Sequence, residues 1–376
     1  MKLPVGLALL ITAAYVVLGF TIDPFRGYAI VINTFLEGKN AILTGAVVLI
    51  YALVNLMNHT GKIETLTRYT GESRFSLIFP ALIIGLVPMP GGAIISAPMV
   101  DEQATKMNFD PEQKVYVNYW FRHMWEFGWP LYPAVILMVQ ITGFDFIQLF
   151  SGMSIFLVIM FFIGYFTILR GHPQPFWERR FKVKGIFSVL YPILIVLILV
   201  VMKVQVLLAL GVVILAYCII EKIPVKIFGK LLLQAFSYKT ILLIYGAMVL
   251  KNMIEAISFG EVLAVSHGII FVLMILLPFL LGLASGLTIT GVGVAIPLFM
   301  MFFGESFSIW HAVVIYASSV CGILVSPAHL CLVLSADFFK TTLKRLYIRF
   351  LIRSVIPLLA VCVITAFLLY HGVLHI

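Results

Sequence analysis

The sequence predicts an all-α polytopic membrane protein that is built from two inverted repeats. Of its 376 residues, 62% are hydrophobic and only 11% are charged, whereas a soluble domain carries about 25% charged residues. Segments 4–20, 41–56, 150–169 and 354–370 contain no charged residue, and each approaches the roughly 20 residues with which a helix crosses a bilayer. These segments lack the alternation of polar and apolar residues that marks the strands of a membrane barrel, so helices are predicted.

Internal matches in a constant order indicate a duplication. Two motifs recur 194 residues apart, since 243 − 49 and 322 − 128 are equal: Leu49-Ile50-Tyr51 as Leu243-Ile244-Tyr245, and Gly128-x4-Pro133 as Gly322-x4-Pro327. Prolines recur in the same order, Pro80 and Pro98 with Pro278 and Pro297. Single matches of such common residues mean little, but an ordered series predicts two related halves.

The elements follow from these two signals, taken in chain order. We divide the chain into residues 1–40 (a first helix and an outer loop), 41–169 (first repeat), 170–239 (central basic loops and a helix pair) and 240–376 (second repeat). Each repeat has a spanning helix (41–58; 240–257), a re-entrant hairpin (74–105; 265–304), an interrupted helix (115–149; 306–338) and a closing helix (150–169; 354–370). Arms of about 8–12 residues on each side of a hairpin tip are too short to span alone. The total is about nine spanning segments and two hairpins.

Basic residues predict the orientation, because cytoplasmic loops are enriched in Lys and Arg. Three clusters fall on one side of this drawing: Arg170 to Lys184, Lys222 to Lys239, and Lys340 to Arg353. Few lie on or near the other side: Arg26, Lys39, Lys203 and Lys251. The N-terminus is therefore expected in the cytoplasm and the C-terminus outside. The net charge of +9 is read as this topology signal, with lipid as a partner, and not as a nucleic-acid surface.

Breaks within apolar segments are where a functional site is expected. Interrupted helices in corresponding positions of two halves mark a binding site near the middle of the membrane, because free N–H groups attract anions and free carbonyls attract cations. The tips and breaks supply the candidate solute-binding residues, which are Pro90, Gly91, Gly92, Arg122, His123, Ser285, Gly286, Thr288, Thr290, Gly291, Ser326 and His329. The candidate residues for a coupling ion are Glu126, Ser318 and Ser319.

Several of these residues have a purely structural alternative. Arg122 and Glu126 lie four apart, so on one helix face they could form a neutralising ion pair instead of a binding site. His123 could titrate, or its ring could only cap a carbonyl. Asn58, Asn118 and Asn252 are expected to bridge helices. The cysteines (Cys218, Cys321, Cys331 and Cys362) have no metal-binding or redox spacing and are expected to be small buried apolar residues. No metal is assigned.

Three motifs resemble a known family. They are Leu86-Val87-Pro88-Met89-Pro90-Gly91-Gly92-Ala93 with Ser96-Ala97-Pro98, then Trp120 to Glu126, and Ser326-Pro327-Ala328-His329-Leu330-Cys331. From about Ala41 onward, the chain is similar to domain-of-unknown-function family 401, a branch of the ion transporter superfamily that is related to divalent anion/sodium symporters and gluconate, citrate and lactate permeases. The resemblance implies paired hairpins, a homodimer and elevator-like alternating access. The Ser-Asn-Thr tip signature of the dicarboxylate symporters is absent, so their specificity does not transfer.

We therefore expect a secondary transporter of a small, anionic, carboxylate-like solute in a prokaryotic-type plasma membrane. No cofactor is expected beyond a coupling ion, sodium or a proton. The alternatives are an intramembrane enzyme or a channel. The chain has no His-Glu-x-x-His, Gly-x-Ser-x-Gly or phosphate-loop pattern, which argues against an enzyme or an ATP-driven pump.

Overall fold

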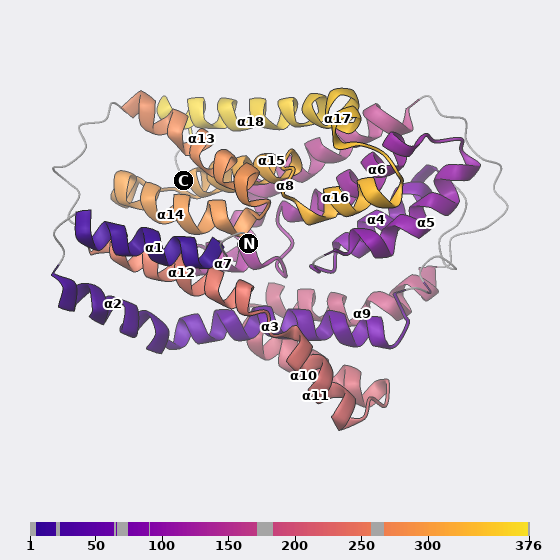
Figure 1. Ribbon diagram of the computed structural model, residues 1–376, viewed down its shortest axis with the longest axis horizontal. Coiled ribbons are helices and arrows are strands. Elements are labelled where there is room, and N and C mark those ends of the chain that lie inside the picture. The colour runs from indigo at the N-terminus through magenta and orange to yellow at the C-terminus, as the bar shows by residue number, and fades with distance from the viewer. Residues whose placement is uncertain are drawn as a thin grey trace.

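The computed structural model describes residues 5–19, 23–63, 65, 74–89, 91–170, 183–256 and 267–374, and within them all regular structure is helical (Figure 1). The first half contains α1 (Val5–Gly19), α2 (Pro24–Leu36), α3 (Gly38–His59), α4 (Arg74–Gly85), α5 (Ala93–Lys106), α6 (Pro111–Trp120), the 3₁₀ turn η2 (Phe121–Glu126), α7 (Pro133–Thr142), α8 (Phe146–Gly164) and η3 (Tyr165–Leu169). The rest contains α9 (Val183–Val201), α10 (Val206–Ile220), α11 (Val225–Ala235), α12 (Tyr238–Glu255), α13 (His267–Ser285), α14 (Thr288–Phe303), η5 (Gly304–Ser306), α15 (Ile309–Leu324), α16 (Leu330–Phe338), α17 (Leu343–Leu346), η6 (Tyr347–Leu351) and α18 (Ile352–Tyr370).

The composition of the helices confirms an integral membrane protein. Six described helical segments are long and apolar enough to cross a bilayer, or seven if the bent pair of α11 and α12 counts as one span. They are Gly38–His59, Phe146–Leu169, Lys184–Val201, Gly268–Ser285, Thr288–Ser306 and Leu343–Tyr370. Large apolar side chains are exposed along these helices, Phe162, Ile198 and Ile364 among them, as lipid contact requires. The expected number of nine spans remains a prediction.

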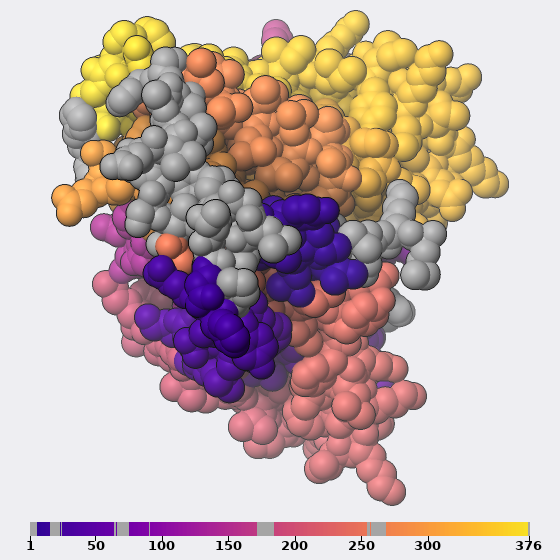
Figure 2. Space-filling model, turned by 60° about the vertical axis from the view of Figure 1, so that its left-hand side comes forward, coloured from indigo at the N-terminus to yellow at the C-terminus, as the bar shows by residue number. Residues whose placement is uncertain are grey.

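The helices pack as two groups, which Figure 1 shows as a lower and an upper layer. The scaffold group comprises α1–α3 and α9–α12, with extensive contacts of α1 on α12 and of α10 and α11 on α3. The hairpin group comprises α4–α8 and α13–α18. Figure 2 shows α1 and α2 (indigo) at the surface beside the salmon helices that include α12, with the C-terminal helices (yellow) along the upper edge of the same face. The groups meet mainly where α12 packs on α14 and α3 on α7.

Two pairs of consecutive helices form hairpins, one in each half of the chain. The arms of the first are α4 and α5, and those of the second are α13 and α14. Each of the four arms contains one internal proline: Pro80, Pro98, Pro278 and Pro297. The arms of the second hairpin have 19 and 16 residues, so the expected length of 8–12 is wrong there. The glycines and the single proline in each of these two arms are accommodated within the helix, so they do not shorten it.

The hairpins enter from opposite ends of the hairpin group (Figure 1). At one end, the last turn of α5 meets the start of α6, where Lys114 Nζ lies 2.6 Å from Asp101 Oδ1. At the other end, the first turn of α13 meets the last turns of α14 and α18, where the ring of Phe271 contacts those of Phe303 and Tyr370. The two tips therefore approach each other in the middle of the group.

Both interrupted helices are broken where the sequence predicts. The first runs through α6 and η2, stops before Gly128, whose φ is +111°, and resumes at Pro133 as α7. The second stops after Leu324 and resumes at Leu330. The first ends earlier than the expected residue 149, because Gly143 terminates α7 in the left-handed conformation and Asp145 caps α8 two residues later.

Two short helices occur where loops were expected. Residues assigned to the outer loop form α2, because Asp23 accepts hydrogen bonds from the backbone N–H groups of Phe25 and Arg26 and Pro24 occupies the first turn, which are strong start signals. The central basic segment likewise contains α11, which begins after Pro224. Beside it, the turn between α9 and α10 lies at Lys203, whose Nζ is 3.0 Å from Asp145 Oδ2. The Lys203 ammonium holds the pKa of this exposed carboxyl below its usual value.

Candidate functional site

The two hairpin tips and the two helix breaks meet around one cavity. Its volume is about 390 Å³. Both tips contribute to its wall through Met89, Gly91 and Gly286, and both breaks contribute through Pro133 and Ala328. The scaffold group closes another side with Tyr51 of α3 and with Thr240 and Leu243 of α12. The cavity therefore lies where the two groups face each other.

Arg122 is a buried side chain that bonds to the backbone of the first hairpin tip. Its side chain is buried, with 3% of the residue exposed. Nη2 donates to the carbonyl of Met89 at 3.1 Å, and Nη1 lies 3.0 Å from Cys331 Sγ. The remaining donor, Nε, has no partner among the described residues. A buried guanidinium without a carboxylate partner is energetically costly unless a ligand neutralises it.

The ion pair between Arg122 and Glu126 that the spacing of four suggests is not present. Residues 121–126 form a 3₁₀ turn, in which side chains three apart overlie one another, so that a spacing of four no longer faces one side. Glu126 instead accepts a hydrogen bond of 3.1 Å from the hydroxyl of Thr288 at the second tip. The two charged side chains thus contact different hairpins.

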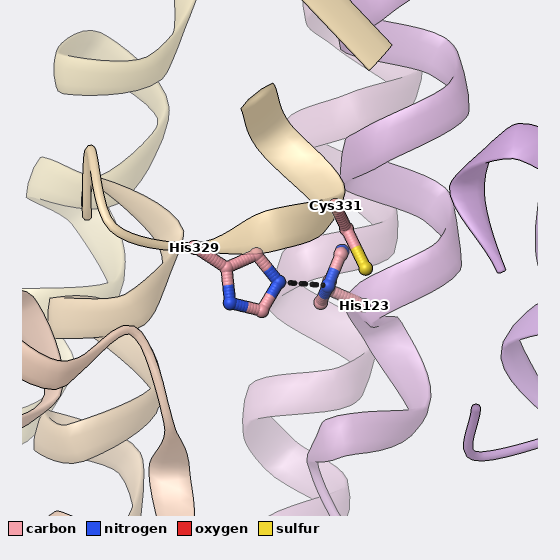
Figure 3. Close-up of side chains that lie close together, drawn as sticks. All are labelled: His123, His329 and Cys331. Carbon is pink, nitrogen blue, oxygen red and sulfur yellow. Dashed lines mark hydrogen bonds between the residues drawn. The ribbon is translucent and has the colours of Figure 1, made fainter. Parts of the chain in front are cut away.

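His123 and His329 face each other across the cavity wall (Figure 3). Their Nε2 atoms are 2.8 Å apart, although 206 residues separate them in the chain. Each Nδ1 points at a backbone carbonyl: that of Tyr119 at 2.6 Å for His123, and that of Gly286 at 2.7 Å for His329. Both rings are buried. His329 therefore joins the second break to the second tip and also reaches the first interrupted helix.

Cys331 belongs to this cluster, contrary to the expectation that every cysteine is an apolar filler. Its Sγ and the nearest ring nitrogens of His123 and His329 all lie within 4.8 Å of one another. These three residues are the only set of three potential ligands that the described part of the chain brings together. The sequence does contain a local signal, His329-x-Cys331 directly after a helix break, but the third member is distant in the chain. All four cysteines are free.

The small polar residues of the second hairpin and the second interrupted helix differ in whether their hydroxyls have partners. Ser285 donates within α13 to the carbonyl of Leu281, and Ser326 of the second break donates to the carbonyl of Leu283 in α13. Ser319 donates to the carbonyl of Thr288 at 3.1 Å. The hydroxyls of Thr290 and Ser318 are buried, and no described residue bonds to them.

The structure brings most, but not all, of the predicted residues to the cavity. Those that line it are Gly91, Arg122, His123, Glu126, Ser285, Gly286, Thr288 and His329. Those outside its lining are Gly92, Thr290, Gly291, Ser318, Ser319 and Ser326. Pro90 lies outside the described residues. Lining residues that the sequence did not single out include Tyr51, Met89, Tyr132, Thr240 and Cys331.

Two of the three asparagines bridge helices as predicted. Asn118 Nδ2 donates to the carbonyl of Ala93 and to Ser335 Oγ, and its Oδ1 accepts from Ser96, so it joins α5, α6 and α16. Asn252 donates to Thr34 of α2. The prediction for Asn58 is wrong, since this residue is exposed at the end of α3.

Comparison with known protein families gives a match. The sequence profile of a family described as "Protein of unknown function (DUF401)" matches residues 1–369. No curated protein matches the chain.

Proposed function

The chain belongs to the DUF401 family of proteins of unknown function, and from its site we propose that it is a secondary transporter of a small anionic solute. The observation that carries this proposal is the cavity at the junction of two hairpin tips and two helix breaks. Non-helical backbone at membrane depth is tolerated where it lines such a cavity, and secondary transporters place their substrate there.

Charge at the cavity favours an anion. Four helices begin beside it, namely α5, α7, α14 and α16, and none has a side-chain hydrogen bond at its N-cap. Free N–H groups at helix N-termini attract negative charge. Arg122 adds a full positive charge, and among the described lining residues only Glu126 is acidic. A cationic solute would be repelled by the helix N-termini and by Arg122, and only the carboxylate of Glu126 would attract it.

The size of the cavity favours a small solute. Ligand pockets usually measure about 300–1,000 Å³, so 390 Å³ is near the lower limit. The walls contain apolar residues such as Leu243, Ile289 and Ile323 beside the polar ones. A carboxylate with a short carbon skeleton matches this combination.

Corresponding contacts in the two halves support inverted repeats. In each hairpin, the end of the first arm packs against a carbonyl of its own interrupted helix: Gly85 against that of Arg122, and Gly282 against that of Ser319. The separation is the same, since 122 − 85 and 319 − 282 both equal 37. The second arms pack crosswise, α5 on α16 and α14 on α7. With the hairpins entering from opposite ends, this pattern is what an inverted duplication produces.

The division into two groups supports elevator-type alternating access. In this proposal the hairpin group carries the solute, and the scaffold group, which supplies Tyr51, Thr240 and Leu243 to the cavity wall, stays fixed. The ion transporter superfamily, to which the sequence motifs are similar, implies the same movement and a homodimer. We propose a prokaryotic-type plasma membrane with the N-terminus in the cytoplasm and the C-terminus outside.

Transport is proposed to be coupled to an ion, sodium or a proton. The candidate residues for this ion are Glu126, Ser318 and Ser319. Glu126 and Ser319 meet at the start of α14, where the hydroxyl of Thr288 donates to Glu126 and its carbonyl accepts from Ser319. The buried hydroxyl of Ser318, which has no described partner, adds an oxygen that a cation could use. Free carbonyls and hydroxyls at a helix break are the usual ligands of a coupling ion.

The experiment is a thermal-shift screen of the purified protein against short carboxylates, inorganic anions and organic cations, with and without sodium. A ligand that binds the folded state at 100 times its dissociation constant stabilises it by about 2.7 kcal/mol. We expect at least one carboxylate to raise the melting temperature and then to accumulate in proteoliposomes. Stabilisation by cations alone would contradict the proposal. Conversion of the ligand to a product would favour an enzyme, and non-saturable flux would favour a channel.

A further inference from the structure

The facing imidazoles of His123 and His329 have an unusual arrangement of protons. Each Nδ1 lies at hydrogen-bonding distance from a backbone carbonyl, and a carbonyl only accepts, so each Nδ1 must carry its hydrogen. In neutral rings both Nε2 atoms then present lone pairs. These lone pairs point at each other across 2.8 Å, which is repulsive unless a cation lies between them.

The third group that points to the same place is a thiol. Cys331 Sγ lies beside both rings (Figure 3), and it comes from the first turn of α16, two residues after His329. We propose that His123, His329 and Cys331 bind one transition-metal ion of the zinc class, through the two Nε2 atoms and the sulfur. Two imidazoles and a thiolate are ligands that Zn²⁺ prefers.

Each of the three ligands already has the outer partner that a metal ligand needs. Metal-binding histidines usually donate their second N–H to a carbonyl or carboxylate, which fixes the ring, and both rings do so here. Cys331 Sγ accepts from Nη1 of Arg122 at 3.0 Å, which stabilises a thiolate by charge. If the two histidines only shared a proton, the two carbonyl contacts would be sufficient. The contact of Arg122 with Cys331 would then have no role.

Only small movements are required to form the site. With Zn–N bonds of about 2.0–2.1 Å and a Zn–S bond of about 2.3 Å, tetrahedral ligand atoms lie roughly 3.3–3.6 Å apart. The Nε2 atoms must separate slightly from 2.8 Å, and the sulfur must approach from within 4.8 Å. We expect rotation of the three side chains to supply these changes, which are each about 1 Å.

Three protein ligands leave one coordination position of a tetrahedral ion open, and all three ligands line the cavity. A divalent ion with one thiolate retains a positive charge next to Arg122. If the protein transports an anion, as proposed above, that anion would be the fourth ligand. Metal binding itself does not depend on transport, and it is measured separately.

The test uses the full-length protein, purified in detergent with a tag that does not bind metals, treated with a chelator and then loaded with Zn²⁺ or Co²⁺. We expect about one tightly bound ion per chain after gel filtration. The Co²⁺ form should show the near-ultraviolet charge-transfer absorption of a thiolate ligand. Both readouts use the wild-type protein, so they do not depend on whether a variant folds.

Variants then locate the ion. Cys331→Ser should abolish the charge-transfer band and weaken Zn²⁺ binding at least about tenfold, and His123→Gln and His329→Gln should each weaken it at least as much. Cys362→Ser, which changes a cysteine that is also buried but lies in α18 away from the cavity, should leave both readouts unchanged.

Two results would overturn the proposal. If the chelator-treated wild-type protein takes up neither ion, the histidine pair shares a proton instead. If metal uptake and the absorption of the three ligand variants equal those of the wild type, the ion binds elsewhere. In both cases the thermal-shift screen for a transported anion could still succeed, so a failure here and a failure of the transport proposal are distinguishable.

Discussion

Arg122 both adds positive charge to the site and fixes the position of two segments that form its wall. One nitrogen of its guanidinium holds the tip of the first hairpin at Met89, and another contacts Cys331 of the second break. Because it lies in a 3₁₀ turn, it forms no ion pair with Glu126, and its Nε, which has no described partner, can contact a solute. The four-residue spacing alone could not show this, since it assumes an α-helix.

Arg122→Gln should weaken anion binding roughly 10- to 100-fold, because a charge-assisted hydrogen bond contributes about 1.5–3 kcal/mol. Isothermal titration with the anion found in the screen measures the change, and Arg26→Gln, at an exposed arginine, is the control. An ion-pair role predicts a different outcome, in which Arg122→Gln lowers stability and Glu126→Gln restores it. Rescue of that kind, with affinity retained, would show that Arg122 does not bind the anion.

Gly286, at the second tip, occupies a position that tolerates little change. Its φ is +70°, and a Cβ would lie 2.8 Å from both the carbonyl carbon of Ala328 and the nitrogen of His329. Gly286→Ala should cost about 1–2 kcal/mol from the backbone alone and displace His329, so solute binding should fall while the protein remains folded.

Gly211→Ala is the matched control, because nothing lies within 4 Å of a Cβ built at Gly211. Binding of the anion by both variants is compared after monodispersity is checked. Normal affinity in Gly286→Ala would remove this tip from the binding site.

Helix breaks were more predictable than helix contacts. Proline and glycine mark the tips and both interruptions directly, so the breaks near Gly128 and Gly322 were found from the sequence. The sequence assigns Asp23 and Pro24 to the outer loop, although they cap and begin α2, because the residues that follow them are too few for a span. The cluster of His123, His329 and Cys331 could not be predicted, because its members converge only after two distant breaks have packed together.

The corresponding contacts of Gly85 and Gly282 allow a test of whether the two hairpins are equivalent. A Cβ at Gly85 would lie 2.3 Å from the carbonyl oxygen of Arg122, and one at Gly282 would lie 2.4 Å from that of Ser319. Each alanine substitution must therefore push a hairpin arm away from its interrupted helix. Overpacking of this kind typically costs about 1–3 kcal/mol.

Gly85→Ala and Gly282→Ala should lower the melting temperature by similar amounts, whereas Gly211→Ala should not lower it. Thermal unfolding in detergent provides the comparison. If the melting temperature fell strongly in one hairpin variant and not in the other, the two halves would not be equivalent.

At the scale of the molecule, the ion pair of Lys203 and Asp145 joins the turn after α9 to the start of α8, so both lie at one end of the protein. The predicted orientation makes this end the outer one. Lys203 and Lys226 are both exposed. In intact cells, a cysteine in place of Lys203 should react with an impermeant thiol reagent, and one in place of Lys226 should react only after permeabilisation. Labelling of the second position from outside would reverse the proposed orientation.

The division into a scaffold group and a hairpin group was not evident from the sequence. Apolar segments reveal where helices lie. In a membrane, however, the helix faces that contact lipid and those that contact other helices are both largely apolar, so the sequence does not show which helices pack together. The contact of α12 with α14 is therefore a finding of the structure. At its centre, a Cβ at Gly293 would lie 2.7 Å from that of Ala247.

This contact permits the most direct test of alternating access. The double variant Ala247→Cys with Gly293→Cys, with Cys218, Cys321 and Cys362 changed to Ser, should form a disulfide across the two groups after a small adjustment toward a Cβ–Cβ distance of about 3.8 Å. Its control joins two helices within the hairpin group, Gly152→Cys in α8 with Val313→Cys in α15, where a Cβ at Gly152 would lie 2.8 Å from the Val313 side chain.

The decisive measurement is uptake of the stabilising carboxylate into proteoliposomes by both double variants, oxidised and then reduced. A transporter in which the hairpin group moves past the scaffold group predicts that oxidation stops uptake only in the Ala247 and Gly293 pair and that reduction restores it. Undiminished uptake by this pair in its fully cross-linked form would contradict the account.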